Sequence, residues 1–365
     1  MIKEISLGSV LDGAEPFIIA KNFVNTKDSI LYIAKDDREI YKISNKLKWL
    51  LPNIEILIYR SWDQIPYDNV SPSKEIQSER IKCLFQLTKE NKKIILTSIN
   101  AIIQKTVNYN FIENNFIEIF IGRKFNFNNL INQLNSLGYD RTSLVRDKGE
   151  FSIRGSIIDI FTADINNPIR IDFFDEVIDS IYTFDPINQK RIKKFTNEKI
   201  LIHSSSEMLL NQNSINLFKK NFRNFFPNYR LSHVYHSFNE GVLPPGGEQF
   251  LPFFVKNMES LFSFLKNLEI ILNKEFFSLL DIRLENINDF YNARKNIKEN
   301  FFLEPSNLYF TRDILLNFIK QYKFTKLEDF KNKNNIDSKI TLVSNLSSIK
   351  KEIDFKFIKK YFLIN

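Results

Sequence analysis

Cysteine is almost absent from this sequence of 365 residues, which contains Cys83 alone. One thiol cannot form an internal disulfide, so a disulfide-stabilised fold is excluded and a reducing compartment is indicated. Cys83 lies in the helical pattern ERIKCLFQL, where we expect a buried structural thiol. No run approaches the ~18 consecutive apolar residues of a membrane span, and MIKEISLGSV does not resemble a signal peptide. We therefore expect a cytoplasmic protein with no membrane contact.

A phosphate-binding loop is also missing, because no segment reads GxxxxGK[ST]. Backbone N–H groups of that loop cradle phosphates, and its hydroxyl holds magnesium. The nearest stretch, GSVLDGAEPFIIAKNF, keeps Gly8 and Gly13 but has neither the lysine nor the hydroxyl. The pair Asp175–Glu176 imitates the acidic end of a magnesium-binding strand, but a polar hairpin turn is the better interpretation. We expect no bound nucleotide and no other cofactor.

Histidine is scarce as well, with His203, His233 and His236 the three present. The residues around them match no metal-ligand spacing and no hydrolase triad order. The sequence therefore predicts no metal site and no catalytic residue, and the chain is not expected to be an enzyme.

Positive charge is in excess, with 51 Lys and Arg against 43 Asp and Glu and a net charge of +8. Such an excess is compatible with nucleic acid or with an acidic protein as partner. The lysines are spread along the chain, however, so most of this charge is expected on solvated faces.

Strand-like and helical segments alternate from Pro16 to about Val107. This alternation predicts an α/β lobe with a parallel sheet and crossover helices. The pattern changes between about 108 and 200, where a strand, an amphipathic helix ending at Gly138 and a hairpin pattern predict a small α+β domain inserted into the lobe. Helical stretches follow, interrupted by the turn sequence GVLPPGGE.

The hairpin pattern runs from Phe151 to Phe184 and has one apolar face. Alternation places Arg154, Arg170 and Phe174 on the opposite face. The members of the apolar face are Phe151, Ile153, Ile157, Ile171 and Phe173, and Ser152, Ser156 and Asp172 accompany the arginines on the other face. Arginine beside an aromatic side chain is typical of protein-binding hot spots. The pattern alone favours a solvated face, with the arginines paired to nearby carboxylates such as Asp159, Asp172 or Asp175.

The segments GEFSIRGSIIDIF and PIRIDFFDEVIDSIYTFDPINQKRI resemble the UvrA-binding module shared by UvrB and the transcription-repair coupling factors. Three further segments resemble the coupling factors in particular. They are YRSWDQIPYDNVSPSKEIQSERIKCLFQL from Tyr59, ILTSINAIIQKTV from Ile95 and EGVLPPGGEQFLPFF from Glu240. The similarity extends from about Gly8 to about Tyr309 and covers the UvrB-like N-terminal part of that family.

This resemblance implies a UvrB-like parallel-sheet lobe with an inserted small α+β UvrA-binding domain. The implied domains are residues 1–112 (first part of the lobe), 113–200 (inserted domain), 201–307 (second part of the lobe) and 308–365 (a linker or the start of a further domain). The lost phosphate loop matches the degenerate nucleotide site of the family.

The resemblance also implies a function. Arg154, Arg170 and Phe174 match the UvrA-contacting positions, so the chain is expected to recruit UvrA to stalled-polymerase sites in transcription-coupled nucleotide excision repair. Contacts with RNA polymerase and DNA are expected only through family regions beyond this chain. Two alternatives remain: a DNA-binding repair module derived from UvrB, and a truncated piece of a full ATP-dependent translocase.

Overall fold

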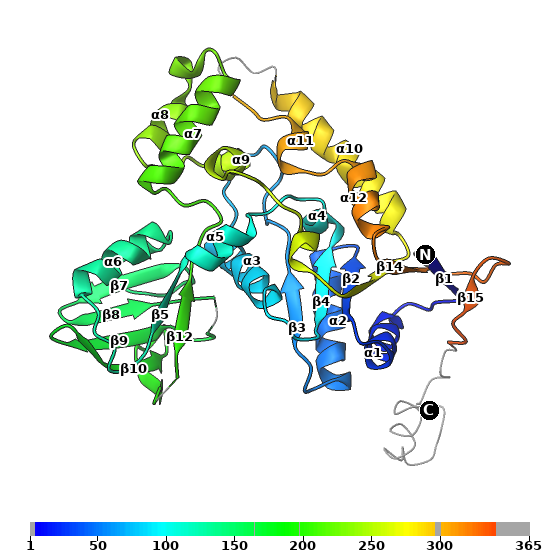
Figure 1. Cartoon of the computed structure of the whole chain (residues 1–365), viewed down its shortest axis with the longest axis horizontal. Helices are drawn as coiled ribbons and strands as arrows, with labels where there is room; N and C mark the ends of the chain where they lie inside the picture. Colours follow the sequence, from blue (N-terminus) through cyan, green and yellow to red (C-terminus); the bar gives the residue numbers. More distant parts are fainter. Residues whose placement is uncertain (1–3, 164, 197, 296–300, 341–365) are drawn as a thin grey trace.

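The computed structural model describes residues 4–163, 165–196, 198–295 and 301–340. It has a lobe built on a parallel sheet, a separate domain built on a mostly antiparallel sheet, and a helical region above the two (Figure 1). The predicted α/β lobe with an inserted α+β domain is therefore confirmed. Within the described residues, no helix combines the length and hydropathy that a membrane crossing requires.

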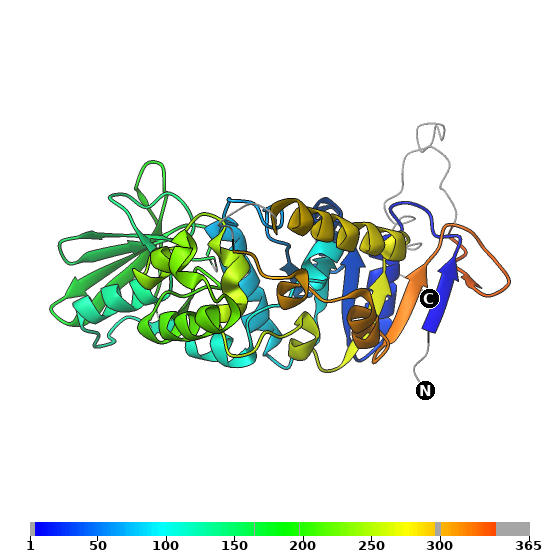
Figure 2. The same cartoon turned by 90° about the horizontal axis from the view of Figure 1, so that it is seen from above.

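The lobe contains a seven-stranded sheet with the order β15-β1-β14-β13-β2-β4-β3, and all its strand pairs are parallel. The strands run side by side in Figure 2. Their bounds are β1 Glu4–Gly8, β2 Ser29–Ala34, β3 Ile56–Tyr59, β4 Ile94–Ser98, β13 Leu268–Leu272, β14 Lys323–Leu327 and β15 Ile336–Asp337. Crossover helices join the parallel strands, as the alternating sequence pattern predicts.

Helices cover both faces of this sheet. Strand β2 reads SILYIA and is buried on both sides, with Ile30 and Tyr32 facing one core and Leu31 and Ile33 the other. Helices α1 (Glu15–Asn25) and α2 (Asp37–Leu50) pack on the Ile30 side. On the other side lie α3 (Lys74–Leu87), α4 (Ile99–Ile102) and α10 (Phe276–Lys295). A continuous apolar strand is typical of parallel sheets covered in this way.

The segment after residue 308 belongs to the lobe as far as the structure describes it. Helix α12 (Arg312–Ile319) leads into β14, which lies between β1 and β13 near the middle of the sheet. The expectation of a linker or a further domain is thus wrong for residues 308–340, and residues 341–365 lie outside the described part of the chain. A strand that returns from the far end of the sequence carries no local signal of its neighbours.

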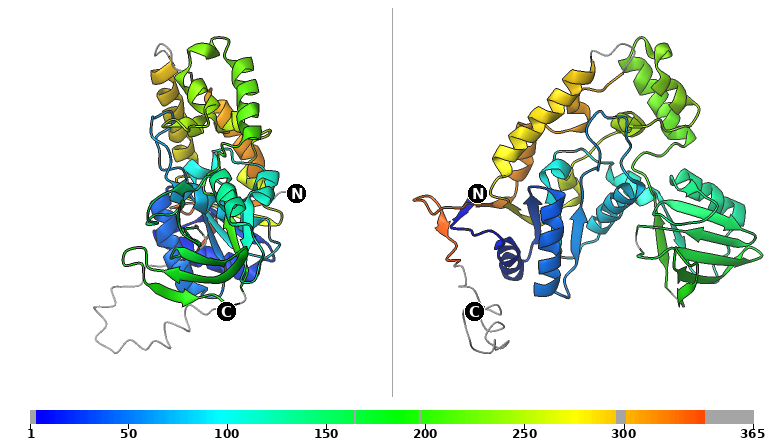
Figure 3. Two further views of the ribbon diagram at one scale, coloured as in Figure 1. Left: turned by 90° about the vertical axis from the view of Figure 1, so that its left-hand side faces the viewer. Right: turned by 180° about the vertical axis from the view of Figure 1, so that it is seen from behind.

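The inserted domain has a six-stranded sheet with the order β11-β10-β9-β8-β7-β6. A two-stranded ladder and helix α6 (Phe127–Ser136) complete it (Figure 3). Its strands are β5 Phe116–Ile119, β6 Asp140–Arg141, β7 Glu150–Arg154, β8 Ile157–Ile160, β9 Ile169–Phe174, β10 Val177–Phe184, β11 Arg191–Lys194 and β12 Ile200–His203. Apolar side chains of α6 and of one sheet face form its own core.

The predicted hairpin is in fact an antiparallel meander of four strands, β7 to β10. Gly155, with φ +59°, and Ser156 turn the chain between β7 and β8, so Arg154 lies directly opposite Ile157. Directly paired residues share a face, and Ile157 is therefore on the arginine face. Its assignment to the apolar face is wrong. The turn interpretation of Asp175–Glu176 is confirmed, since these residues connect β9 to β10.

The helical region is held together by phenylalanines. It comprises α7 (Gln212–Phe225), α8 (His233–Asn239) and α9 (Leu251–Phe254), together with short helical turns. The ring centroid of Phe218 lies 4.7 Å from those of Phe238 and Phe254. Such contacts stabilise the region beyond simple burial of apolar area.

A buried ion pair connects the lobe to the exit of the inserted domain. Arg80 on α3 and Glu207, which follows β12, lie 2.9 Å apart between Nε and Oε1, and both side chains are almost wholly buried. Trp62 Nε1 donates to Glu207 Oε2 at 2.5 Å, and Arg80 Nη1 donates to the Arg60 carbonyl oxygen at 2.6 Å. The guanidinium also lies 4.3 Å from the Tyr59 ring centroid. The motif residues Trp62 and Arg80 therefore have a structural role.

The GVLPPGGE segment packs against the same motif. Gly246 has φ +70°, and its backbone N–H donates to Ser71 Oγ at 3.2 Å. A Cβ atom at Gly246 would lie 2.2 Å from the Asp68 carbonyl oxygen. Gln77 Nε2 also lies 3.4 Å from the buried Glu248 carboxylate. The two motif segments thus form one structural unit, and the turn interpretation of GVLPPGGE is confirmed.

Candidate functional site

One face of the six-stranded sheet carries the predicted partner-binding residues. Phe151, Ile171 and Phe173 point into the domain core. The alternate residues form the opposite face, where Asp159 on β8 is paired in register with Arg170 on β9, and Arg170 with Tyr182 on β10. Apart from Ile157, the predicted division into an apolar and a charged face is therefore confirmed by the strand register.

Asp159 is the centre of this face. Its side chain is fully buried and accepts bonds from two arginines. Arg170 Nε and Nη2 bind its two oxygens at 2.5 and 2.7 Å, and Arg154 Nη2 binds Oδ2 at 2.5 Å. Two-point guanidinium–carboxylate pairs fix orientation as well as charge. Asp159 therefore holds both predicted arginines in one geometry.

Arg170 is mainly a structural residue. Only 11% of its side chain is exposed, and its guanidinium lies 4.4 Å from the centroid of the buried Phe184 ring. A third bond runs from Nη2 to Gln189 Oε1 at 3.0 Å. The hydrogen bonds to Asp159 raise the pKa of Arg170. The pairing of arginine with a nearby carboxylate, weighed from the sequence, is what the structure shows here.

Arg154 and Phe174 are accessible. Arg154 keeps 44% of its side chain exposed while bound to Asp159, and Phe174 is 79% exposed at the end of β9. Phe174 follows Arg170 by four residues on one strand, so it lies on the same face, about 13 Å along the strand. The three predicted residues thus share a face, but only Arg154 and Phe174 present substantial surface to a partner.

Sequence reasoning missed two residues of this face. Arg191 on β11 lies over the Tyr182 ring, with Cζ 3.9 Å from the centroid, and Gln189 completes the partners of Arg170. The sequence QKRI contains both residues, but it does not predict that β11 pairs with β10. No local pattern identified these contacts.

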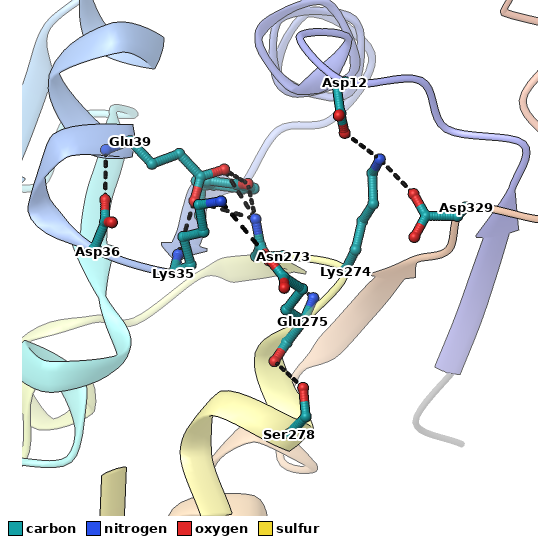
Figure 4. A network of polar contacts seen from close by, with 10 residues as sticks. Asp12, Lys35, Asp36, Glu39, Asn273, Lys274, Glu275, Ser278 and Asp329 are labelled. Carbon is teal, nitrogen blue, oxygen red and sulfur yellow. Dashed lines mark hydrogen bonds and ion pairs between the residues drawn. The ribbon is translucent and has the colours of Figure 1, made fainter. Parts of the chain in front are cut away.

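A second place of interest is a 450 Å³ cavity at the carboxyl ends of β1, β2 and β13. Open parallel sheets bind ligands at this edge. Figure 4 shows that several of its polar groups bind one another or a neighbouring residue: Lys274 Nζ lies 2.8 Å from Asp12 and 2.6 Å from Asp329. Asn273 Nδ2 donates to both Glu39 oxygens at 2.9 and 3.1 Å.

The cavity does not reproduce a phosphate cradle. Glu15 lines it from the first turn of α1, where a bound phosphate would meet a carboxylate beside the positive end of the helix dipole. Burial raises the pKa of Glu39, which also accepts a hydrogen bond from Tyr32 at 2.8 Å. The lining combines five cationic side chains with five carboxylates, and Glu15 is the carboxylate at the helix end where a phosphate would bind.

The remaining titratable candidates are structural. Cys83 is buried on α3, and burial raises the pKa of its thiol to about 12, as expected of an unreactive cysteine. His203 packs 4.3 Å from the Phe85 ring between β12 and α3, and burial lowers its pKa to about 4. Among the residues that the structure describes, no group of three or more His, Cys, Asp or Glu side chains could hold a metal ion.

Comparison with known families identifies the inserted domain. Residues 117–206 match the model of the UvrB interaction domain. The matched range includes strands β6 to β12 and all of β5 except Phe116, and therefore the whole face that carries Arg154 and Phe174.

Comparison with curated proteins covers most of the chain. It is 32% identical over 346 residues to the transcription-repair-coupling factor of Rickettsia typhi, which is 92% of this chain and 30% of that protein. Identity to the Haemophilus influenzae factor is 28% over 319 residues, 87% of this chain and 28% of the relative. Identity to the Escherichia coli factor is 26% over 269 residues, which is 73% of this chain and 23% of that protein. The chain spans less than a third of the length of these relatives. It is similar to the N-terminal region of the transcription-repair-coupling factors and carries a UvrB interaction domain.

Proposed function

We propose that this chain is an adaptor that recruits UvrA to stalled-polymerase sites in transcription-coupled nucleotide excision repair. The observation that carries the proposal is the exposed pair Arg154 and Phe174 on the domain that matches the UvrB interaction domain. The adaptor would act in the cytoplasm. RNA polymerase and DNA would be met through family regions beyond this chain.

The geometry suits recognition of a protein surface. Arg154 is held by Asp159, so less rotamer freedom is lost when its remaining N–H groups bind a carboxylate of the partner. Phe174 offers a large, rigid apolar ring that loses water on contact. Arg170 supports this surface from below through Asp159 and contributes little contact area of its own.

The same proposal includes the absence of ATP hydrolysis by this chain. It is supported by the sequence, which lacks the lysine-containing loop, and by Glu15, a carboxylate that lines the cavity at the start of α1, where a phosphate would bind. Purified chain mixed with ATP, magnesium and duplex DNA should release no phosphate above the buffer rate. DNA-stimulated phosphate release would overturn this part of the proposal.

Titration of purified UvrA into the chain tests the adaptor role. We expect binding by the wild type and a loss of about 1 to 4 kcal/mol for Phe174→Ala, the range for truncated hot-spot residues. Equal affinities for the two proteins would remove Phe174 from the interface.

Direct DNA binding is the second candidate, and strand β11 favours it. All four of its residues are exposed, and three of them, Arg191, Lys193 and Lys194, are cationic. Binding to phosphates weakens steeply with salt because counterions are released, whereas a protein interface responds less. Titration of a fluorescent duplex at two salt concentrations separates the two functions.

A further inference from the structure

A third arginine lies on the face that carries Arg154 and Phe174. Arg191 comes from the edge strand β11 and crosses β10, with its guanidinium stacked on Tyr182 and Nη2 3.5 Å from Asp172 Oδ2 on β9. Asp172 lies between Arg170 and Phe174 in the alternation of β9 and therefore on the same face. The Arg191 side chain is 67% exposed. Its position is thus fixed on one side and open to solvent on the other.

The turn before β11 presents an apolar side chain. Ile187 is 91% exposed at the tip of this turn. The Asp185 carboxylate accepts hydrogen bonds from the backbone N–H groups of Ile187 at 2.7 Å and Asn188 at 3.1 Å, which fixes the tip. Gln189, with φ +61°, donates to the Pro186 carbonyl oxygen at 2.9 Å.

This turn is joined to the arginine pair. Gln189 Oε1 accepts the bond from Arg170 Nη2 at 3.0 Å, and Arg170 in turn binds Asp159. Hydrogen bonds therefore connect Gln189, which lies between Ile187 and Arg191 in the sequence, through Arg170 and Asp159 to Arg154. Strands β8, β9 and β10 separate β7 from β11, so a partner that contacts both Arg154 and Arg191 must cover the breadth of this face.

We propose that Ile187 and Arg191 form a second contact cluster for the protein partner of Arg154 and Phe174, and that this partner presents carboxylates beside an apolar surface. The inference rests on the proposed function. Strand β11 exposes the cationic side chains of Arg191, Lys193 and Lys194. A partner surface that carries carboxylates would be complementary to this positive charge.

Arg191 and Ile187 are partly ordered before any partner binds. A guanidinium has five N–H donors, and the bond of Arg191 to Asp172 is long and exposed, so it is weak. Stacking on Tyr182 still restricts the side chain, which lowers the entropy lost on contact. Ile187 is likewise held in place while its side chain stays in water.

The test measures the affinity of purified UvrA for five variants of the full chain, one of which is Phe174→Ala. Arg191→Ala and Ile187→Ala should each weaken binding roughly 5- to 30-fold, the range for a loss of 1 to 2 kcal/mol. Arg191→Lys should fall between Arg191→Ala and wild type, because lysine keeps the charge but not the planar stack. The control is Lys199→Ala, a change at a 66% exposed lysine paired with Glu118 in the same domain, which should leave affinity unchanged.

Two results would overturn the inference while the proposed function survives. One is weakened binding by Phe174→Ala together with wild-type affinity of Arg191→Ala and Ile187→Ala. The other is a selective loss of duplex DNA binding by Arg191→Ala, with UvrA affinity unchanged. If UvrA binds neither wild type nor variants, the inference and the proposed function fail together.

Discussion

Arg170 binds Asp159 through two parallel hydrogen bonds across the β8–β9 pair, from Nε to Oδ1 at 2.5 Å and from Nη2 to Oδ2 at 2.7 Å. The carboxylate is fully buried and also binds Arg154. One buried carboxylate thus positions two arginines that have different roles. Arg170 is largely buried and stabilises the domain, whereas Arg154 is partly exposed to solvent.

The first prediction compares how much Arg170 and Arg154 contribute to stability. Arg170→Ala removes two of the three arginine bonds to the buried Asp159 and should lower the free energy of unfolding by about 3 kcal/mol. Arg154→Ala removes one half-exposed partner and should cost about 1 kcal/mol. Urea unfolding followed by circular dichroism measures both. Equal losses of stability in the two variants would show that Arg170 stabilises the buried Asp159 carboxylate no more than Arg154 does.

The second prediction concerns the ion pair between Arg80 and Glu207. Arg80→Met leaves the Glu207 carboxylate buried without its cation and should cost about 3 to 5 kcal/mol of stability. Lys266→Met is the matched control, because its pair with Glu90 has a similar distance of 2.7 Å but is exposed. The control should change stability by less than about 1 kcal/mol. Similar losses in the two variants would contradict the role of burial.

The third prediction tests the packing of GVLPPGGE on the lobe. Gly246→Ala combines a left-handed backbone with a Cβ atom 2.2 Å from the Asp68 carbonyl oxygen. Gly122→Ala has φ +84° but no atom within 4 Å of the new Cβ, so it reports backbone strain alone. We expect a loss of about 1 kcal/mol for Gly122→Ala and a clearly larger loss for Gly246→Ala in thermal unfolding. Indistinguishable melting temperatures would mean that the two segments are not in close contact.

The fourth prediction is a pH dependence from His203. Burial lowers its pKa from 6.5 to about 4. Between pH 4 and pH 6.5, His203 is therefore protonated in the unfolded chain and neutral in the folded chain. This contribution is fully favourable above pH 6.5 and is lost as the pH falls toward 4, by up to about 3 kcal/mol.

Comparison of variants isolates this effect from other titrating groups. His203→Gln should be less sensitive than wild type to a fall from pH 6.5 to 4, measured by urea unfolding at each pH. His236→Gln, at an exposed position on α8, should follow the wild-type curve. A His203→Gln curve parallel to wild type would show that His203 is not buried as a neutral ring.

Much of the fold could be predicted from periodicity. The alternating pattern gave the helices and strands of the lobe up to β4, and the two faces of β9 followed from alternation at Arg170, Ile171 and Asp172. Two failures have physical reasons. The Gly155 turn moved Ile157 to the other face because a short turn inverts the alternation. Strand β14 joins β1 and β13 over a long sequence separation, which no local pattern encodes.

The candidate site was predicted in part. Resemblance pointed to Arg154, Arg170 and Phe174, and the structure places all three on one face. Their different exposures could not be foreseen, because the burial of Arg170 depends on its register with Asp159 and on the position of Phe184. The contribution of β11 was missed for the same reason, since its pairing with β10 is a tertiary fact.

The affinity of UvrA for the double variant Arg154→Ala/Phe174→Ala tests the central claim most directly. Phe174 is exposed and the loss of Arg154 should cost about 1 kcal/mol of stability, so the variant should remain folded with a slightly lower melting temperature than wild type. Titration calorimetry with purified UvrA should then show binding by the wild type and at least about 30-fold weaker binding by the folded variant. Wild-type affinity in a variant that remains folded would contradict the account.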